Sequence, residues 1–247
     1  MYLTLQGLVV RVTEYKEQDM LLTLLTKDYG RITVKARGVR RRNNPHTSAC
    51  QLLALSEFTL FEYKDSYVVR EARVLELFQE LRQDIKKLAL ATYIVQVISL
   101  ISQEDSPSPE LQPLALNCLF GLSKLNIPED KVKCVFELRC ACLAGFTPDL
   151  QGCRVCGNTT PDYFDISEGC LECYSCRPND FGGIRMPISE GMLNAMRYIC
   201  YCDPKRLFSF ALSDEALASL SKVTEAFLAT QLERGFSSLD FYKSLCI

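Results

Sequence analysis

The sequence has few of the features that enzymes use for catalysis. Its 247 residues include one histidine, His46, in a polar loop where we expect it to be exposed and without a role. No GxxxxGK(S/T) phosphate loop, no GxGxxG dinucleotide motif and no GxSxG nucleophile turn occurs. We therefore expect a protein that is not an enzyme, because none of these catalytic chemistries has a site in the chain.

Signals for export and for membrane insertion are also missing. The first residues, MYLTLQGLVVRV, lack the basic segment and long apolar core of a signal peptide. The longest uncharged candidate, residues 88–103, is too short to span a bilayer. We therefore predict a cytoplasmic protein, in which the thirteen cysteines are metal ligands and buried thiols rather than a disulfide framework.

A net charge of −2 leaves no positive field around the whole molecule, so any nucleic-acid site must be a local patch. One candidate is clear. Residues 27–42 contain seven basic residues against one acidic residue, a net charge of +6. This segment is the strongest local concentration of charge that we identify in the chain.

The first 80 residues predict a small β-barrel. Runs rich in Leu, Val, Ile and Thr are separated by polar turns, and they predict strands at 2–12, 20–26, 31–39, 52–63 and 67–75, the first bent near Gly7. Five short strands fit a Greek-key barrel, of which the oligonucleotide-binding OB-fold is the best-known example. We expect residues 1–80 to form an OB-fold domain.

The basic residues fall on one strand and the loop after it. Lys35 and Arg37 lie on the same face of the third strand, and a flexible loop continues the patch with Arg40, Arg41 and Arg42. Phosphate groups attract such a patch through counterion release. The alternative is a solvated strand face that only aids solubility.

Aromatic residues on the last two strands give weaker support. We consider four as platforms on which bases could stack: Phe58, Phe61, Tyr63 and Tyr67. Aromatic residues in strands more often belong to the core, and we assign Phe58 to it.

From residue 84 the apolar period changes to that of helices. We predict helices at 84–103, 109–126, 128–144, 190–202 and 213–234, with N-caps at Ser108, Ser189 and Ser213. The second helix should have Pro109 at its first position. Residues 81–247 would form a helical domain with a metal finger inserted at 151–178, and the apolar C-terminal tail should pack back on it.

Two C-x2-C pairs predict the metal site. Cys153 and Cys156 are followed after sixteen residues by Cys173 and Cys176, a spacing that lets four thiolates surround one Zn²⁺. An iron–sulfur cluster is an alternative, because Cys170 extends the second pair to C-x2-C-x2-C. With no histidine nearby and no open position, we expect the zinc to be structural.

The remaining cysteines have no predicted role. Four lie on predicted helices, where a buried thiol acts as a small apolar side chain: Cys118, Cys134, Cys140 and Cys142. Cys200, Cys202 and Cys246 are expected to be core or surface thiols.

The order of these parts resembles the RecO family of bacterial recombination mediators. The matching segments are GLVVRVTEYKEQDMLLTLLTKDYGRITVKARGVRR, DIKKLALATYIVQVIS, CRVCG…YFDISEGCLECYSC and FSSLDFYKSL, and together they cover nearly the whole chain. The resemblance implies an OB-fold, a helical domain and a four-cysteine zinc finger. It also implies a nucleoid-associated protein that binds single- and double-stranded DNA, anneals complementary strands, and acts with RecR and sometimes RecF to load RecA on strands coated by single-strand-binding protein (SSB).

Several residues carry this resemblance. The finger positions are Cys153, Cys156, Cys173 and Cys176, and the family's basic strand and loop correspond to Lys35, Arg37, Arg40, Arg41 and Arg42. One departure is that the family usually has Gly-Gly shortly before the second pair, where this chain has Gly169 and Cys170. This leaves a choice between Cys170 and Cys173 as ligand, and we favour Cys173. The site for the SSB tail has no residue-level match.

Two other functions stay open. An RNA-binding or translation-associated protein with an OB-fold and a zinc finger would have the same parts. A metalloenzyme would need acid and base groups near the metal, which the finger does not offer.

Overall fold

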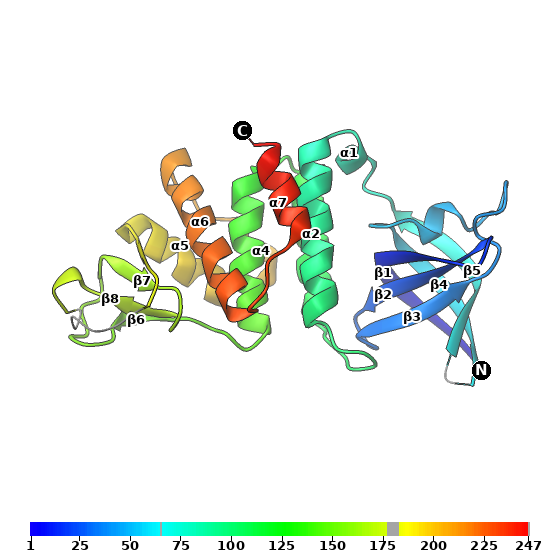
Figure 1. The fold of residues 1–247 in the computed structure, drawn as a ribbon, viewed down its shortest axis with the longest axis horizontal. Coiled ribbons are helices and arrows are strands. Elements are labelled where there is room, and N and C mark those ends of the chain that lie inside the picture. The colour runs from blue at the N-terminus through cyan, green and yellow to red at the C-terminus, as the bar shows by residue number, and fades with distance from the viewer. Residues whose placement is uncertain (65, 177–182, 247) are drawn as a thin grey trace. The chain divides into compact units, whose positions relative to one another are not determined.

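The computed structural model describes residues 1–64, 66–176 and 183–246 (Figure 1). The chain forms two compact units, one of Met1–Asn126 with Phe236–Ile247 and one of Ile127–Gly235. The first unit therefore contains both the barrel and several helices, whereas the domain boundary expected at residue 80 stays a prediction. In the described residues, none of the helices combines the length and the apolar character needed to cross a membrane.

The first unit begins with a closed five-stranded barrel, which confirms the predicted OB-like fold (Figure 1). Its strands are β1 (Tyr2–Tyr15), β2 (Asp19–Thr26), β3 (Arg31–Ala36), β4 (Leu55–Tyr63) and β5 (Ser66–Glu76), arranged in the order β1-β2-β3-β5-β4. β1 pairs with β4 up to Leu8 and with β2 from Gly7 onward. This change of partner at the predicted bend lets one long strand join two parts of the barrel.

The barrel encloses an apolar core. Alternate residues of the strands point inward, including Leu22, Leu24, Val34 and Leu60, and Phe58 is fully buried as predicted. Closure depends on a short parallel pair in which Val34 and Lys35 of β3 face Tyr67 and Val68 of β5.

The third strand is shorter than the predicted 31–39. It ends at Ala36 because the Gly38 amide donates a hydrogen bond of 2.7 Å to Asp19 Oδ1, and Gly38 has φ +62°. Such a φ suits glycine and turns the chain away from the strand direction. The loop that follows contains the short 3₁₀ helix η1 (Ser48–Cys50), and β4 begins at Leu55 rather than at 52.

Four helices complete the first unit: α1 (Gln79–Arg82), α2 (Ile85–Ile101), α3 (Leu111–Ser123) and α7 (Ser237–Ser244). The C-terminal tail packs back as expected, since α7 lies along α2 and the rings of Tyr93 and Phe236 meet edge to face, 5.5 Å apart (Figure 1). The Ser108 cap is wrong. α3 starts after Glu110, because Ser108 accepts the Leu111 amide through its carbonyl and closes a separate turn before the helix.

The second unit holds helices α4 (Glu129–Leu143), α5 (Glu190–Tyr201) and α6 (Asp214–Gln231), with a small sheet beside them. The sheet consists of β6 (Asp149–Cys153), β7 (Tyr163–Asp165), β8 (Cys170–Glu172) and β9 (Arg185–Pro187), in the order β6-β8-β7-β9. The 3₁₀ helices are η2 (Tyr174–Cys176) and η3 (Pro204–Arg206). The predicted caps are confirmed, because Ser189 accepts the Met192 amide and Ser213 accepts the Ala216 amide, each at 3.3 Å.

A buried polar network joins α4 to α6. Lys133 Nζ lies 3.1 Å from the Glu137 carboxylate and 2.9 Å from that of Glu225, and donates to the Ser221 carbonyl at 3.0 Å. Thr224 donates to Glu137 at 2.7 Å. Burial opposes the charge on Lys133, but the two carboxylates more than offset it and raise its pKa. The ammonium is therefore held charged inside this unit.

Candidate nucleic-acid interface and metal site

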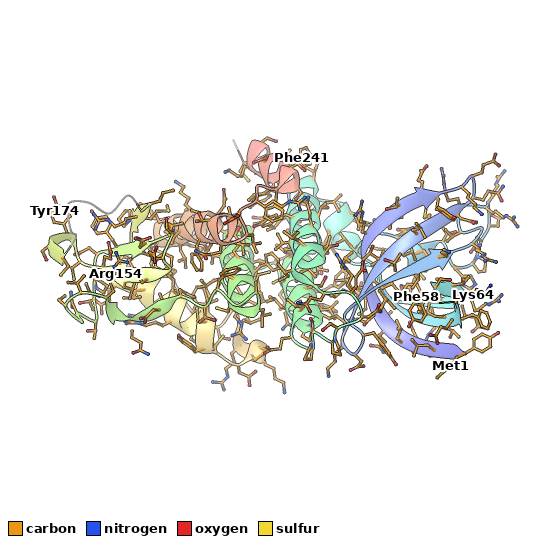
Figure 2. The ribbon with its side chains drawn as sticks, turned by 60° about the horizontal axis from the view of Figure 1, so that its bottom comes forward. Met1, Phe58, Lys64, Arg154, Tyr174 and Phe241 are labelled. Carbon is orange, nitrogen blue, oxygen red and sulfur yellow. The ribbon has the colours of Figure 1, made fainter. Side chains whose placement is uncertain are left out.

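A groove of about 460 Å³ lies on the outside of the barrel, and four basic side chains line it. Its lining residues, which we call the basic groove, are Lys35, Arg37, Phe61, Lys64, Ser66, Val68 and Arg70. Figure 2 labels Lys64 on the barrel, together with the core residue Phe58. Lys35 and Arg37 were predicted from the sequence. Lys64 and Arg70 were not, and they come from the β4–β5 hairpin.

The strand register explains why these residues meet. Lys35 of β3 lies opposite Val68 of β5, and Val68 lies opposite Phe61 of β4, so the three side chains share one face of the sheet. Their neighbours Val34 and Leu60 point into the core, so this face is the outer one. Arg70 follows Val68 by two residues and extends the same face.

Two rings and a guanidinium form a cluster around Phe61, which lines the groove. The Arg70 guanidinium carbon is 5.0 Å from the centre of the Phe61 ring, and the centre of the Tyr2 ring, tilted by 56°, is 5.3 Å from that of Phe61. Tyr2 is 64 % exposed, so this cluster is open to solvent at Tyr2. Exposed rings next to cationic side chains can hold nucleic-acid bases and phosphates together.

Of the other predicted stacking residues, Phe58 lies in the barrel core. Tyr67 packs partly against the barrel core. The side chain of Tyr63 lies outside the described part of the structure.

The loop with Arg40, Arg41 and Arg42, which we expected to be flexible, forms several hydrogen bonds. Asn44 Nδ2 donates to the Gly38 carbonyl at 3.0 Å, and Thr47 Oγ1 donates to that of Val39 at 2.9 Å. His46 is half-buried, and its Nδ1 accepts the Ala72 amide at 3.2 Å. The expectation that His46 is exposed and without a role is therefore wrong, because it ties the loop to β5.

The three arginines of this loop differ in their partners. Arg40 forms an ion pair of 3.0 Å with Glu14, and Arg41 Nε donates to Gln18 Oε1. Arg42 is exposed and, within the residues the structure describes, has no ion pair. Arg42 is thus the arginine of this loop that is most available to an external anion.

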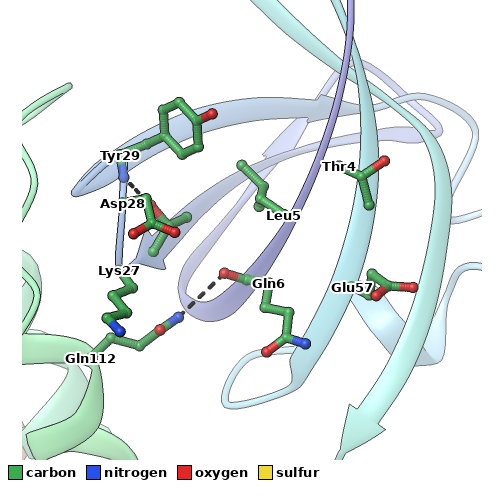
Figure 3. A pocket seen from close by; sticks show the side chains of 9 residues that line it. Thr4, Leu5, Gln6, Lys27, Asp28, Tyr29, Glu57 and Gln112 are labelled. Carbon is green, nitrogen blue, oxygen red and sulfur yellow. Dashed lines mark hydrogen bonds between the residues drawn. The ribbon is translucent and has the colours of Figure 1, made fainter.

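Two basic residues of the +6 segment are not in the groove or the loop. Arg31 donates to the Ser99 carbonyl at 2.6 Å and pairs with Glu104 at 3.3 Å, so it fastens the barrel to the end of α2. Lys27 lines a second pocket of about 560 Å³, together with Thr4, Leu5, Gln6, Thr26, Asp28, Tyr29, Glu57 and Gln112 (Figure 3). That pocket contains acidic as well as basic side chains, and Gln112 closes it by donating to the Gln6 carbonyl at 3.3 Å (Figure 3).

Sequence reasoning missed Lys64, Arg70 and Tyr2. A signal for Arg70 was present, because alternation along β5 puts it on the same face as Val68. The sequence does not show which face of β5 lies beside Lys35. The answer depends on the parallel pairing of β3 and β5, which closes the barrel.

The four predicted metal ligands come together in the second unit. The Sγ atoms of Cys153, Cys156, Cys173 and Cys176 all lie within 4.8 Å of one another, and those of Cys156 and Cys173 are 3.8 Å apart. A tetrahedral zinc with Zn–S bonds of about 2.3 Å places sulfur atoms about 3.8 Å apart. The donor set and its dimensions therefore fit a zinc ion.

Main-chain groups prepare this site for thiolates. Burial opposes ionisation of Cys153, but the N–H groups of Cys156, Val155 and Cys173 lower its pKa to about 6. Asn158 Nδ2 donates to Cys173 Sγ at 3.2 Å. This hydrogen bond favours the Cys173 thiolate, but burial and the hydrogen bonds with Cys156 and Cys153 raise the pKa of Cys173 overall, and the Cys156 hydrogen bond raises that of Cys176 to about 12. The main-chain donors therefore favour the deprotonated form that a metal binds at Cys153.

Cys170 lies outside the cluster of four. Burial raises the pKa of its thiol, and its charged neighbour is Arg154, which forms an ion pair of 2.6 Å with the buried Glu172 (Figure 2 labels Arg154). The structure thus gathers Cys173, and not Cys170, with the other three thiols. All thirteen cysteines are described and none forms a disulfide, whereas residues 177 and 178, the last two of the predicted finger, lie outside the described residues.

Comparisons with known proteins cover nearly the whole chain. The family model described as "Recombination protein O N terminal" matches residues 1–78, and "Recombination protein O C terminal" matches residues 82–240. A protein named "DNA repair protein RecO" from Acetivibrio thermocellus is 34 % identical over 99 % of this chain and 97 % of its own length. Proteins of the same name are 28 % identical in Alkaliphilus metalliredigens, over 99 % of this chain and all of that one, and 27 % identical in a Thermoanaerobacter species, over 97 % and 96 %.

Proposed function

Because the chain belongs to the RecO family of DNA repair proteins, we propose that it is a recombination mediator that acts without catalysis. It binds single- and double-stranded DNA, anneals complementary strands, and with RecR, and sometimes RecF, helps to load RecA on DNA coated by SSB. It works in the cytoplasm, on the DNA of the nucleoid. Family membership supports these partners, and their surfaces on this chain are not assigned.

The observation that carries the DNA-binding part of this proposal is the basic groove. Lys35, Arg37, Lys64 and Arg70 surround Phe61 on the outer face of the barrel. Cationic side chains attract phosphates of any sequence, and exposed rings stack on any base, so the groove suits sequence-independent binding. A mediator of annealing needs this property, because it must hold whichever strand is presented.

We propose that the loop provides a second set of phosphate contacts. Arg42 would contribute most, whereas Arg40 must first leave Glu14 and Arg41 must leave Gln18. Giving up an existing ion pair or hydrogen bond offsets part of what a phosphate contact gains, so Arg40 and, to a smaller extent, Arg41 add less than residues of the groove.

The four cysteines would hold a structural Zn²⁺ through Cys153, Cys156, Cys173 and Cys176. Four thiolates fill a tetrahedral shell and leave no position for a substrate or an activated water. The zinc would stabilise a finger whose strands, of three to five residues, are too short to form a core alone.

Strand annealing of complementary DNA coated with SSB tests the function. The protein should accelerate annealing, and Lys35→Gln/Arg37→Gln/Arg70→Gln should remove most of that acceleration. Wild-type protein that fails to anneal the coated strands would argue against a mediator. Preference for RNA over single-stranded DNA in direct competition would instead favour an RNA-binding protein, because the 2′-hydroxyl lets a protein distinguish RNA from DNA.

A further inference from the structure

Two cysteines outside the metal cluster meet where α4 ends and α5 ends. The Sγ atoms of Cys142 and Cys200 are 3.7 Å apart, although 58 residues separate them in the chain. Cys200 is 7 % exposed and Cys142 is half-buried, so one thiol of the pair is reachable from solvent. The sequence predicts a small buried side chain at Cys142 and a core or surface thiol at Cys200, and their contact makes a dithiol.

The surroundings distinguish the two thiols. The hydrogen bond with Cys200, aided by Thr147 and by the charge of Arg139, lowers the pKa of Cys142 to about 7, although burial opposes this. The same hydrogen bond and burial raise the pKa of Cys200. Arg139 is fixed in this place because its guanidinium donates to the Cys200 carbonyl at 2.7 Å. A reachable thiol that is ionised near neutral pH, beside a second thiol, is the arrangement found in oxidation-sensitive cysteine pairs.

We propose that Cys142 and Cys200 form a site of reversible oxidation by hydroperoxides, with Cys142 as the attacking thiol and Cys200 as the resolving thiol. The Cys142 thiolate attacks one peroxide oxygen, the O–O bond breaks, and hydroxide leaves, which gives a sulfenic acid. Cys200 then attacks the Cys142 sulfur, the S–O bond breaks, and water leaves with the thiol proton. In total, two thiols are oxidised to a disulfide, and one hydrogen peroxide is reduced to two waters.

The position of the pair gives this bond a structural consequence. α4 leads into the finger through β6, and β9 leads out of it into α5. A bond between Cys142 and Cys200 would therefore close a covalent loop that contains the whole finger. Oxidised protein should keep the ends of α4 and α5 joined even when the metal has been removed.

The site is separate from the four-cysteine cluster, and the test must keep the two apart. Full-length, zinc-loaded protein is treated with one equivalent of hydrogen peroxide, and a chromogenic chelator records any zinc release. Free thiols are then alkylated under denaturing conditions, and mass spectrometry counts and maps those that remain. We expect two fewer alkylations, a cross-link between the peptides 140–154 and 198–205, and recovery of both thiols with dithiothreitol.

Variants identify which cysteines in those peptides react. Cys142→Ala and Cys200→Ala should each abolish the cross-link, whereas the matched controls Cys140→Ala and Cys202→Ala should retain it. Loss of two thiols with zinc release, a cross-link to a finger cysteine, or an unchanged cross-link in Cys142→Ala would overturn the proposal. Fragmentation of the wild-type cross-linked peptides assigns the bond directly, so the result stands even where a variant does not fold.

Discussion

Removing charge from the basic groove should change the salt dependence of DNA binding, not only its strength. The perturbation is Lys35→Gln/Arg37→Gln/Arg70→Gln, which keeps long polar side chains on the outer face of β3 and β5 and removes three positive charges. Lys64 is left unchanged because its φ of +46° lies in the left-handed region, where a new side chain could disturb the hairpin.

The size of the effect follows from counterion release. Each phosphate contact on a single strand contributes about −0.7 to the slope of log affinity against log salt, so losing three contacts should flatten the slope by about 2. If the variant and wild type bind equally at 1 M salt, affinity at 0.1 M salt should fall about 100-fold. Four groove cations in the wild type correspond to a total slope of about −3.

Fluorescence anisotropy with a labelled oligonucleotide of mixed sequence, measured between 0.05 and about 0.5 M salt, provides the slope over a useful range of screening. The matched control is Lys205→Gln/Arg206→Gln/Lys222→Gln, which removes the same net charge from exposed positions of the second unit. If the change in DNA affinity came only from the loss of net charge, the groove variant and the control variant would lose DNA affinity equally. A groove variant with the wild-type slope would refute the assignment of phosphates to this groove, even if its affinity were lower.

Four further outcomes follow from the structure. Phe61→Leu should weaken binding to single strands by about 1–3 kcal/mol and affect duplex much less, which the same anisotropy assay checks, and equal losses for both would contradict stacking. Zinc analysis should find one metal per chain, which Cys153→Ala or chelation removes, and limited proteolysis should then cut the finger while the affinity of the groove for DNA is kept. Lys133→Met should lower the free energy of unfolding by about 3–5 kcal/mol in chemical denaturation, because Glu137 loses its buried partner, whereas Lys222→Met on the surface of α6 should have little effect. The alkylation rate of Cys142 should rise with pH through a midpoint near 7, since its lowered pKa keeps the thiolate down to that pH, and a midpoint near 8.5 would show an ordinary thiol.

Patterns that depend on near neighbours in the chain were sufficient for much of the fold. Alternation gave the five strands, and Ser189 and Ser213 cap their helices because an N-cap needs only an amide three residues away. The four-cysteine cluster was equally local, since each C-x2-C turn fixes two thiols. Ser108 failed because a competing turn through its carbonyl precedes the helix, and residue identity alone does not distinguish these two arrangements.

Features that depend on distant contacts could not be predicted from the sequence. The +6 segment looked like one patch, but Arg31 is used inside the fold by Ser99 and Glu104, and Arg40 is paired with Glu14. Likewise, Cys142 and Cys200 meet because two helices pack together, one of which precedes the finger in the chain and the other of which follows it. A count of charges along the chain therefore overestimates how many cations can bind an external anion. A count of thiols likewise does not show which of them meet, because burial and folded-state partners decide both.

The barrel closure also links the fold to the proposed function. Lys35 and Arg70 lie on β3 and β5, which are joined, among the residues the structure describes, by two residue pairs, Val34 with Tyr67 and Lys35 with Val68. The groove exists only while these strands stay together, because their separation would move Lys35 away from Phe61 and Arg70. Substitutions that weaken this parallel pair should therefore reduce DNA affinity without removing any charge, and they should do so in proportion to the fraction of molecules in which the barrel is open.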